Sequence, residues 1–397
     1  MQEIFSLMWL LLIRELYACS WTKRAAPRQR WMSAASTALG DDTQQIAWVG
    51  GTKLNYINGK PMGDRANVSV YDLSSNSWYE DWPSMPTARS APATGVLHSR
   101  LYVFGGSMQV NSTTHQGLST ITLDVVESFP FSAKPSHQTN QTKSVTSSWS
   151  SETRLPQRIE SPSAVSLEHG IVIAGGFSSY IDNETHMLHF AYHNETWLFD
   201  GKGYHTLPKL PFSRSNMGLV AAHGGIYALG GGELDPSYNN CSFLANVTGK
   251  VIVSKHGKLQ AESAAKWETC PDLLEARSWM ATGVATNQTS GEDIVVVAGG
   301  MSDTFSPMSG VDFLLKHPSS IHVEQSNPSS VFSDHVEAYN RNRTEVQWQP
   351  SNCDLPFKSG FLSGDGLVTS NNSFTFILYS GEAPFPEADG AYVLTIT

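Results

Sequence analysis

The sequence predicts an all-β protein made of six repeated units that close into a ring. Three observations support this prediction. A short apolar run ending in two glycines recurs along the chain, an aromatic, proline and arginine element follows most copies, and the two chain ends together supply one unit. Frequent glycine (32) and proline (20) among 397 residues are typical of many short strands joined by turns.

The apolar runs form the first part of each unit. A continuous apolar run of this length is typical of a strand buried on both faces, and two glycines after it indicate a close approach of another backbone. The runs with their glycines span residues 46–51, 101–106, 171–176, 226–231, 294–300 and 376–381, and the last has serine for the first glycine. Successive glycine pairs lie 55, 70, 55, 69 and 81 residues apart, so the second, fourth and fifth units carry insertions.

The second part of each unit is an aromatic residue, then a proline, then a cationic residue. The members in chain order are Trp78, Pro86 and Arg89; Trp149, Pro156 and Arg158; Tyr204, Pro211 and Arg214; Trp267, Pro271 and Arg277; and Trp348, Pro356 and Lys358. The sixth copy is split, because Trp21, Pro27 and Arg30 stand at the other end of the chain. We therefore expect the N-terminal strand to pair with the C-terminal strands, which closes the ring without free sheet edges.

This combination of a double glycine, a Tyr-Asp pair (Tyr71-Asp72 in the first unit), a later tryptophan and a Pro–Arg turn resembles the kelch family. The resemblance covers the chain from about Trp21 onward. It implies a single domain over residues 21–397, folded as a six-bladed β-propeller with four strands in each blade. It also implies that the tryptophans pack between blades.

Two features predict a secreted protein or one retained in the secretory pathway. Residues 4–13 form an apolar run too short to span a bilayer, followed by small residues, which is typical of a signal peptide over residues 1–20. No later segment is apolar enough to cross a membrane. Chance would give roughly three or four glycosylation sequons, whereas this chain has ten, at Asn67, Asn111, Asn140, Asn183, Asn194, Asn240, Asn246, Asn287, Asn342 and Asn371.

Cysteine is scarce, so the chain is no disulfide-dense small scaffold. Cys241 and Cys270 are the preferred disulfide pair. A second bridge is possible if Cys19 survives processing, whereas cleavage after Ser20 would leave three cysteines, one of them odd. No CxxC motif is present, which argues against thiol redox chemistry and structural zinc.

Motifs of metal, nucleotide and nucleic-acid chemistry are absent from the sequence. His186, His189 and His193 are better interpreted as loop histidines than as a metal site. No Walker A motif, nucleophile elbow or dinucleotide fingerprint occurs, and no residue set matches the Cys–Tyr copper site of galactose-oxidase-like propellers. The net charge of −10 and the lack of a basic stripe argue against a nucleic-acid partner. We expect no metal and no cofactor.

The resemblance places two sets of loops at the mouth of the propeller's central funnel. These loops offer four cationic candidates for catalysis, Arg89, Arg214, Arg277 and Lys358. They also offer candidate substrate-binding residues: Trp31, Met108, Phe177, Tyr180, Asn216, Trp279 and Met301. The mixture suits a small, largely apolar ligand that carries an anionic or carbonyl oxygen. Alternatively, the arginines are structural and bind turn carbonyls within the blades.

A bare, sequon-rich propeller with long insertions is similar to the fungal glycosylated propeller proteins of tropolone-sesquiterpenoid pathways. Those proteins act as hetero-Diels–Alderases. The similarity is one of architecture, size and sequons. It implies that a tropolone o-quinone methide adds to an alkene of a humulene-type sesquiterpene and forms a dihydropyran without a cofactor. The four cations would bind the tropolone oxygens, and the aromatic residues would shape the terpene side.

Two other classes of function stay open. A secreted kelch binding module for a glycan or a protein would present aromatic residues on an open face and would turn over no small molecule. A hydrolase or lyase would use loop carboxylates such as Glu233, Asp235 and Glu382, and would show a bell-shaped dependence of rate on pH.

Overall fold

The computed structural model describes most of the strands and the turns between them. The described residues are 19–28, 33–40, 44–55, 60–111, 118–131, 148–181, 188–222, 225–233, 241–245, 266–287, 292–301, 311–316, 346–350, 353–356, 362–369, 373–380 and 391–397. Within these segments every regular element is a β-strand, which confirms the all-β prediction. None of them contains a helix long and apolar enough to cross a membrane.

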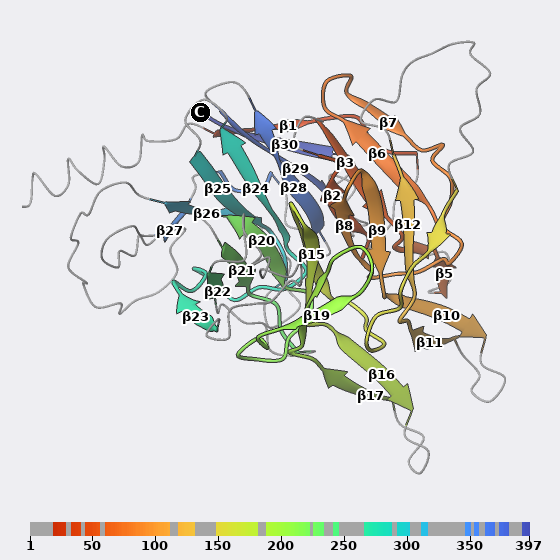
Figure 1. Cartoon of the computed structure of the whole chain (residues 1–397). Helices are drawn as coiled ribbons and strands as arrows, with labels where there is room; N and C mark the ends of the chain where they lie inside the picture. The colour runs from red at the N-terminus through yellow and green to blue at the C-terminus, as the bar shows by residue number, and fades with distance from the viewer. Residues whose placement is uncertain are drawn as a thin grey trace, which may run out of the picture.

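Four sheets in the described chain have four antiparallel strands each and correspond to the first four sequence units (Figure 1). The first holds β2 (Ala35–Ala38), β3 (Gln45–Val49), β6 (Val68–Asp72) and β7 (Ser77–Tyr79). The second holds β8 (Ala93–Leu97), β9 (Arg100–Phe104), β12 (Val126–Pro130) and β13 (Ser150–Ser151). The third holds β14 (Ser163–Leu167), β15 (Gly170–Ala174), β18 (Thr196–Phe199) and β19 (Tyr204–Leu207). The fourth holds β20 (Gly218–Ala222), β21 (Gly225–Leu229), β22 (Cys241–Ala245) and β23 (Trp267–Cys270).

The last two sequence units share one sheet of eight described strands. Its order is β1 (Cys19–Lys23), β30 (Ala391–Ile396), β29 (Phe374–Ser380), β28 (Leu362–Thr369), β24 (Ala281–Asn287), β25 (Glu292–Ala298), β26 (Val311–Lys316) and β27 (Val346–Pro350). The two halves are antiparallel and are joined by a short parallel pairing of β24 with β28. Glycines explain this contact, because a Cβ atom at Gly283 would lie 2.7 Å from the Cα atom of Asp365.

Three two-stranded hairpins follow the glycine pairs of the first three units. They are β4 (Thr52–Asn55) with β5 (Lys60–Asp64), β10 (Ser107–Asn111) with β11 (Leu118–Thr122), and β16 (Phe177–Ile181) with β17 (Leu188–Tyr192). Figure 1 shows β10–β11 and β16–β17 projecting from the same side of the molecule. Strands β5 and β10 are in contact, as are β11 and β16, so the three hairpins form a continuous group.

The sheets have a propeller-like arrangement around a centre. The first strand of each unit contacts the first strand of the next, in the order β2, β8, β14, β20, β24 and β28, and β28 contacts β2 again. The hydrophobic clusters lie between neighbouring sheets: Phe104 of β9 packs with Ile173 of β15, and Leu229 of β21 packs with Val297 of β25. The core is therefore distributed around the ring, as expected for units that cannot bury both faces alone.

The double glycines occupy backbone conformations that other residues rarely adopt. Gly105 and Gly106 have φ angles of 57° and 92°. A Cβ atom on Gly106 would lie 2.6 Å from the carbonyl oxygen of Ser90. These positions need glycine both for the left-handed backbone and for the close approach of the segment that leads into the sheet.

Aromatic residues on the outer strands bind the backbone of the preceding unit. The indole N–H of Trp78 donates to the Ala25 carbonyl at 2.7 Å, and that of Trp267 donates to the Pro208 carbonyl at 2.8 Å. The same bond runs from Trp149 to the Pro83 carbonyl at 2.7 Å. These bonds satisfy the polar end of side chains that otherwise pack against the neighbouring sheet.

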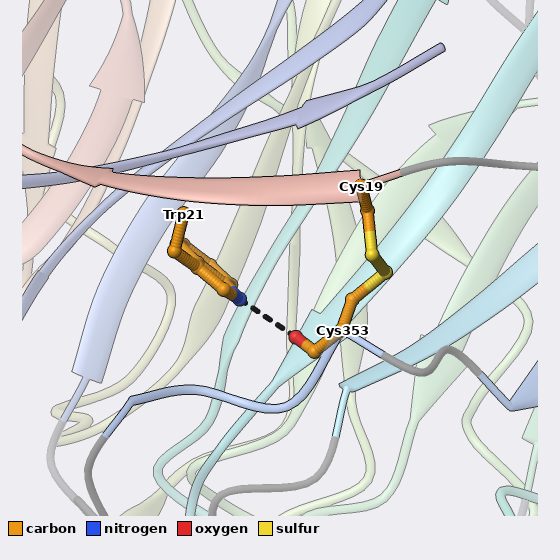
Figure 2. The surroundings of a disulfide bond; sticks show 3 residues. All are labelled: Cys19, Trp21 and Cys353. Atoms are coloured by element: carbon orange, nitrogen blue, oxygen red, sulfur yellow. Dashed lines mark hydrogen bonds between the residues drawn. A yellow bond between two sulfur atoms is a disulfide. The ribbon is translucent and has the colours of Figure 1, made fainter.

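The N-terminal strand closes the ring, as the split repeat predicts. Strand β1 pairs antiparallel with β30, with Cys19 opposite Ile396 and Lys23 opposite Tyr392. Figure 2 shows a disulfide between Cys19 and Cys353, beside a 2.6 Å hydrogen bond from the Trp21 indole to the Cys353 carbonyl. Cys19 and Ser20 belong to the described strand β1, and removal of residues 1–20 would take away one partner of this bridge.

The preferred cysteine pair of the sequence analysis also lies on facing strands. Cys241 on β22 and Cys270 on β23 are register partners. The sulfur of Cys270 is in a disulfide. None of the cysteines in the described chain is a free thiol.

We predict that the double substitution C19S/C353S lowers the free energy of unfolding by about 2–5 kcal/mol, because the bridge closes a loop that spans most of the chain. Urea unfolding under oxidising conditions measures the change. Wild-type protein in dithiothreitol provides a comparison, although it also loses the Cys270 disulfide. An unchanged midpoint in the double variant would show that the strand pairing alone closes the ring.

Candidate functional site: the central cavity

A cavity of about 780 Å³ runs along the inner strands at the centre of the ring. All six inner strands, β2, β8, β14, β20, β24 and β28, contribute to its wall. A cavity of this volume is within the range of small-molecule sites. The centre of the ring is therefore the first candidate for a functional site.

A collar of five residues surrounds one end of this cavity. The collar residues Ser33, Ala91, Ser161, Asn216 and Trp279 each precede an inner strand, line the cavity and have φ angles between 47° and 52°. None of them is glycine, so each backbone is strained, and the bulky Trp279 most of all. Strain of this kind is retained where the surrounding structure requires it, often at functional sites.

Backbone hydrogen bonds link the collar residues in sequence around the cavity. The amide of Ala91 donates to the Ser33 carbonyl at 2.8 Å, and the amide of Ser161 donates to the Ala91 carbonyl at 2.9 Å. The series continues from Asn216 to Ser161 at 3.4 Å and from Trp279 to Asn216 at 3.1 Å. Because each bond joins two units, the collar fixes the width of the cavity mouth.

The wall of the cavity is rich in hydroxyl groups and small side chains. Several of these hydroxyls bind backbone groups of the neighbouring unit: Ser36 donates to the Gly364 carbonyl at 3.1 Å, and Ser163 donates to the Met217 carbonyl at 2.6 Å. The described lining residues include three acids, Glu168, Asp293 and Asp365, and no lysine, arginine or histidine. The cavity thus has a mixed polar and apolar lining, and its described charged residues are all acidic.

Asp365 is the acid at the centre of this wall, on strand β28. Its carboxylate accepts hydrogen bonds from the amides of Ala38 at 2.9 Å and Gly366 at 2.8 Å. Surrounding strands enclose the carboxyl group, although part of the residue faces the cavity. Burial raises the pKa of Asp365 to about 6, although the hydrogen bonds from the two backbone amides act to lower it. The group can therefore exist as a neutral acid near pH 6.

Two of the predicted ligand-binding residues lie at the cavity, Asn216 and Trp279, both in the collar. Met301 is buried and pairs with Ser278 through an isolated bridge, outside the cavity lining. Met108 lies on β10, and Phe177 and Tyr180 lie on β16, so the hairpins hold these three. Trp31 and Lys358 lie outside the described residues.

The three described arginine candidates have a structural role instead of lining the cavity. Arg89, Arg214 and Arg277 are 0–1% exposed. Each donates to the carbonyl of the first glycine of the following pair: Arg89 to Gly105 at 2.9 Å, Arg214 to Gly230 at 3.1 Å, and Arg277 to Gly299 at 3.2 Å. Their placement favours the structural alternative, because a guanidinium enclosed between sheets cannot contact a ligand.

Arg89 also forms a buried ion pair. Its guanidinium lies 2.5 Å from the carboxylate of Glu127. The backbone carbonyl of Arg89 accepts from the amide of Gly51 at 2.9 Å, while its guanidinium binds Gly105 of the following unit, so the residue joins two glycine turns. Ile159 takes the equivalent place in the next link, since its carbonyl accepts from Gly106 at 2.9 Å. Arg158, which the repeat pattern aligns with Arg89, is therefore one residue out of register.

The sequons are described only in part. The side chains of Asn67 and Asn194 are described, and both are half-buried. For the sequon asparagines at 111, 140, 183, 240, 246, 287, 342 and 371, the side chains lie outside the described residues. Neither carboxylate pairs nor histidines gather as a metal site anywhere in the described segments.

Sequence reasoning missed Asp365 and the collar as a set. The only local signal for Asp365 is its position between Gly364 and Gly366, which marks a close backbone approach but not a cavity. The collar residues differ in side chain, and their shared feature is a backbone angle that follows from ring geometry.

Comparisons with known proteins add no assignment. No protein-family profile matches this chain, and no curated protein matches it either.

We predict that Arg89→Ala lowers the free energy of unfolding by about 3–5 kcal/mol, because it leaves the buried Glu127 carboxylate without its partner. The matched control is Arg154→Ala, which breaks an exposed ion pair with Asp124 and is expected to cost about 0.5 kcal/mol. Urea unfolding at pH 7 compares the two. Equal effects would contradict the structural role of Arg89.

A second prediction concerns pH. The folded state raises the pKa of Asp365 to about 6 from 3.8, so it binds this proton more tightly than the unfolded state does. The contribution of Asp365 to stability is greatest below pH 4, is lost as pH rises to about 6, and stays constant above that. Asp365→Asn should remove this loss, about 3 kcal/mol at most.

The measurement is the free energy of unfolding of both proteins at pH 4, 5, 6 and 7. The difference between variant and wild type isolates Asp365 from carboxyl groups of lowered pKa, such as Asp72 and Asp200, which act in the opposite direction. A difference that does not vary with pH would contradict the burial of the charge.

Proposed function

We propose that the chain is a six-bladed propeller of the kelch type. The closed circle of six inner strands supports this count. The eight-stranded sheet supports it as well, because its halves, β24–β27 and β28–β30 with β1, are each a four-stranded antiparallel unit. The double glycines, each bound by an arginine of the preceding sequence unit, fit the kelch resemblance.

We also propose that the protein is N-glycosylated and secreted or retained in the secretory pathway. The sequons and the apolar N-terminal run support this, and so does the Cys19–Cys353 disulfide, since such bridges persist in oxidising compartments. The disulfide limits signal cleavage to a site before Cys19.

For the activity, we propose a hetero-Diels–Alderase that joins a tropolone o-quinone methide to a humulene-type sesquiterpene within the central cavity. The observation that supports it best is the cavity itself, about 780 Å³ with Trp279 and Asn216 at its mouth. This volume suits two small reactants. Holding both in one orientation replaces a bimolecular encounter, which is the main contribution a cofactor-free pericyclase can make.

The electrostatics of this proposal differ from those expected from the sequence. The arginines are enclosed between sheets, so hydrogen bonds to the heterodiene would come from groups at the cavity, the Asn216 amide and the Asp365 carboxyl in its neutral form. With Asp365 neutral, the two other acids of the wall, Glu168 and Asp293, repel an ionised tropolone. The wall therefore favours the neutral quinone methide, which is the reactive species.

Trp279 would shape the apolar side of the site. Its φ angle of 48° costs conformational energy that a glycine would avoid, so its indole ring has a use other than backbone stability. A flat aromatic surface at the mouth can bind the hydrocarbon ring and exclude water from the quinone methide.

A binding module for a glycan or a protein is the second candidate. Large hydrophobic side chains are exposed on and beside the hairpins: Ile121, Tyr180, Phe190 and Phe212. Tyr180 is 54% exposed and stacks on His189 with ring centroids 5.5 Å apart. Exposed aromatic rings of this kind suit sugar or protein contacts and need no cavity.

We predict that the purified glycosylated protein accelerates formation of one adduct stereoisomer from a hydroxymethyl tropolone and humulene alcohol. Chiral chromatography with mass detection measures the rate of formation of each stereoisomer. Trp279→Ala should lower the rate at least about tenfold, whereas Tyr180→Ala on the hairpin should leave it unchanged.

The second candidate predicts the reverse result. Wild type would give only the uncatalysed mixture of stereoisomers, and Tyr180→Ala would weaken binding on a glycan array while Trp279→Ala would not. Unfolding midpoints of both variants serve as the control for folding.

A further inference from the structure

One position of the repeat, directly before a collar residue, carries an acid at Glu160 where the described neighbouring units carry serine. The residues directly before the collar residues Ala91, Asn216 and Trp279 are Ser90, Ser215 and Ser278, whereas Glu160 precedes Ser161. All four form the same isolated bridge to the segment after a glycine pair, for Glu160 with Phe177 at the start of β16. Glu160 is thus a departure from the repeat in an unchanged backbone frame.

Hydroxyl groups connect Glu160 to a second acid. The carboxyl of Glu160 is hydrogen-bonded to the side chain of Ser107, the first residue of β10. The hydroxyls of Ser107 and Ser90 are 3.0 Å apart, and Ser90 is hydrogen-bonded to the carboxyl of Asp64 at the end of β5. Asp64 also accepts a short bond from the amide of Gln109 on β10.

This network joins the roots of all three hairpins, by which we mean the ends of β5, β10 and β16 that lie next to the glycine pairs. Asp64 belongs to β4–β5, Ser107 and Gln109 belong to β10–β11, and Glu160 binds the first residue of β16. Farther out, the hydroxyl of Thr122 on β11 accepts from the amide of Ser179 on β16 at 3.1 Å. Hydrogen bonds therefore link the three hairpins at their roots, and the second and third hairpins farther out as well.

Neither acid forms an ion pair with a described residue; Glu160 is largely enclosed and Asp64 is half-buried. Burial raises the pKa of Glu160 to about 7, and the charge of Asp64 adds to this rise; burial raises the pKa of Asp64 as well. Among the described ion pairs, the guanidinium of Arg89 is held by Glu127, and Arg65 pairs with neither acid. Two enclosed carboxylates that share a hydrogen-bonded network favour keeping one proton between them.

We propose that Asp64 and Glu160 together form a proton-binding site that locks the roots of the three hairpins beside the cavity collar. With one proton bound, the hydroxyls of Ser107 and Ser90 can carry a chain of hydrogen bonds from one carboxyl to the other. When the proton leaves to solvent, two enclosed negative charges repel each other, and the bonds from Ser107 and Gln109 weaken. Because Ser90 and Glu160 directly precede the collar residues Ala91 and Ser161, this change also reaches the cavity mouth. The proposal does not depend on the reaction catalysed.

The test is hydrogen exchange with mass detection on the intact glycosylated protein between pH 5 and pH 8, with rates corrected for intrinsic exchange. The folded state binds the proton more tightly, so protection of the β10 segment, residues 107–111, should be highest at pH 5. It should fall by roughly 10- to 100-fold as pH passes through 7. Protection of β15, in the core of the third sheet, should not follow this profile.

Glu160→Gln keeps the shape of the side chain but cannot ionise, so it should give protection that is independent of pH. Asp64→Asn should move the profile to lower pH without removing it, because burial still raises the pKa of Glu160 when the neighbouring charge is gone. The matched control is Glu168→Gln, an exposed acid outside the network, which should keep the wild-type profile. If Glu160→Gln folds poorly, Glu160→Ser supplies the residue found in neighbouring links and should also remove the pH dependence.

Three results would overturn the proposal: a flat profile for wild type, an unchanged profile in the Glu160 variants, or loss of the profile in Glu168→Gln. A purely structural role for Glu160 would lower protection in the variants equally at every pH. The pH profile therefore separates a proton-binding site from a packing role.

Discussion

Contact between each double glycine and the segment entering the next sheet is the constraint on which the rest of the structure depends. The second glycine of a pair donates its amide to the carbonyl of that segment, from Gly51 to Arg89 and from Gly176 to Arg214. A Cβ atom at Gly106 would collide with the backbone it approaches. Because this contact recurs, the inner strands start at equal heights, and the residue before each can bond to its neighbour as part of the collar.

The arginines reinforce this contact from the other side. The carbonyl of Arg214 accepts a hydrogen bond from the amide of Gly176. Its guanidinium donates a hydrogen bond to the carbonyl of Gly230 in the next glycine pair. One residue thus joins two glycine turns, and these hydrogen bonds help to satisfy a cation that is buried between sheets. Ile159 shows that the backbone hydrogen bond forms without a guanidinium, since its carbonyl still accepts from the amide of Gly106.

Ring closure and the shape of the cavity follow from two further contacts. The Cys19–Cys353 bridge and the Trp21 indole hold the N-terminal strand on the last sheet. Strand β28 lies between β29 and β24, and Gly283 lets β24 approach β28 closely enough to pair with it in parallel. Asp365 on β28 then bonds to Ala38 on β2. An acid therefore faces the cavity at the point where the ring closes, and its enclosure changes its proton affinity.

Sequence alone determined the all-β class, the repeats, the glycine turns and the pairing of the chain ends, because these depend on local periodicity and on glycine's conformational freedom. It also placed Asn216 and Trp279 near the cavity. It could not decide the orientation of the arginines, since the same Pro–Arg turn can direct a guanidinium into a funnel or between sheets. Only the tertiary structure decided that, together with the collar, the enclosure of Asp365 and the meeting of Asp64 with Glu160. Each of these joins residues from different units, and their distances depend on how tightly the sheets pack around the ring.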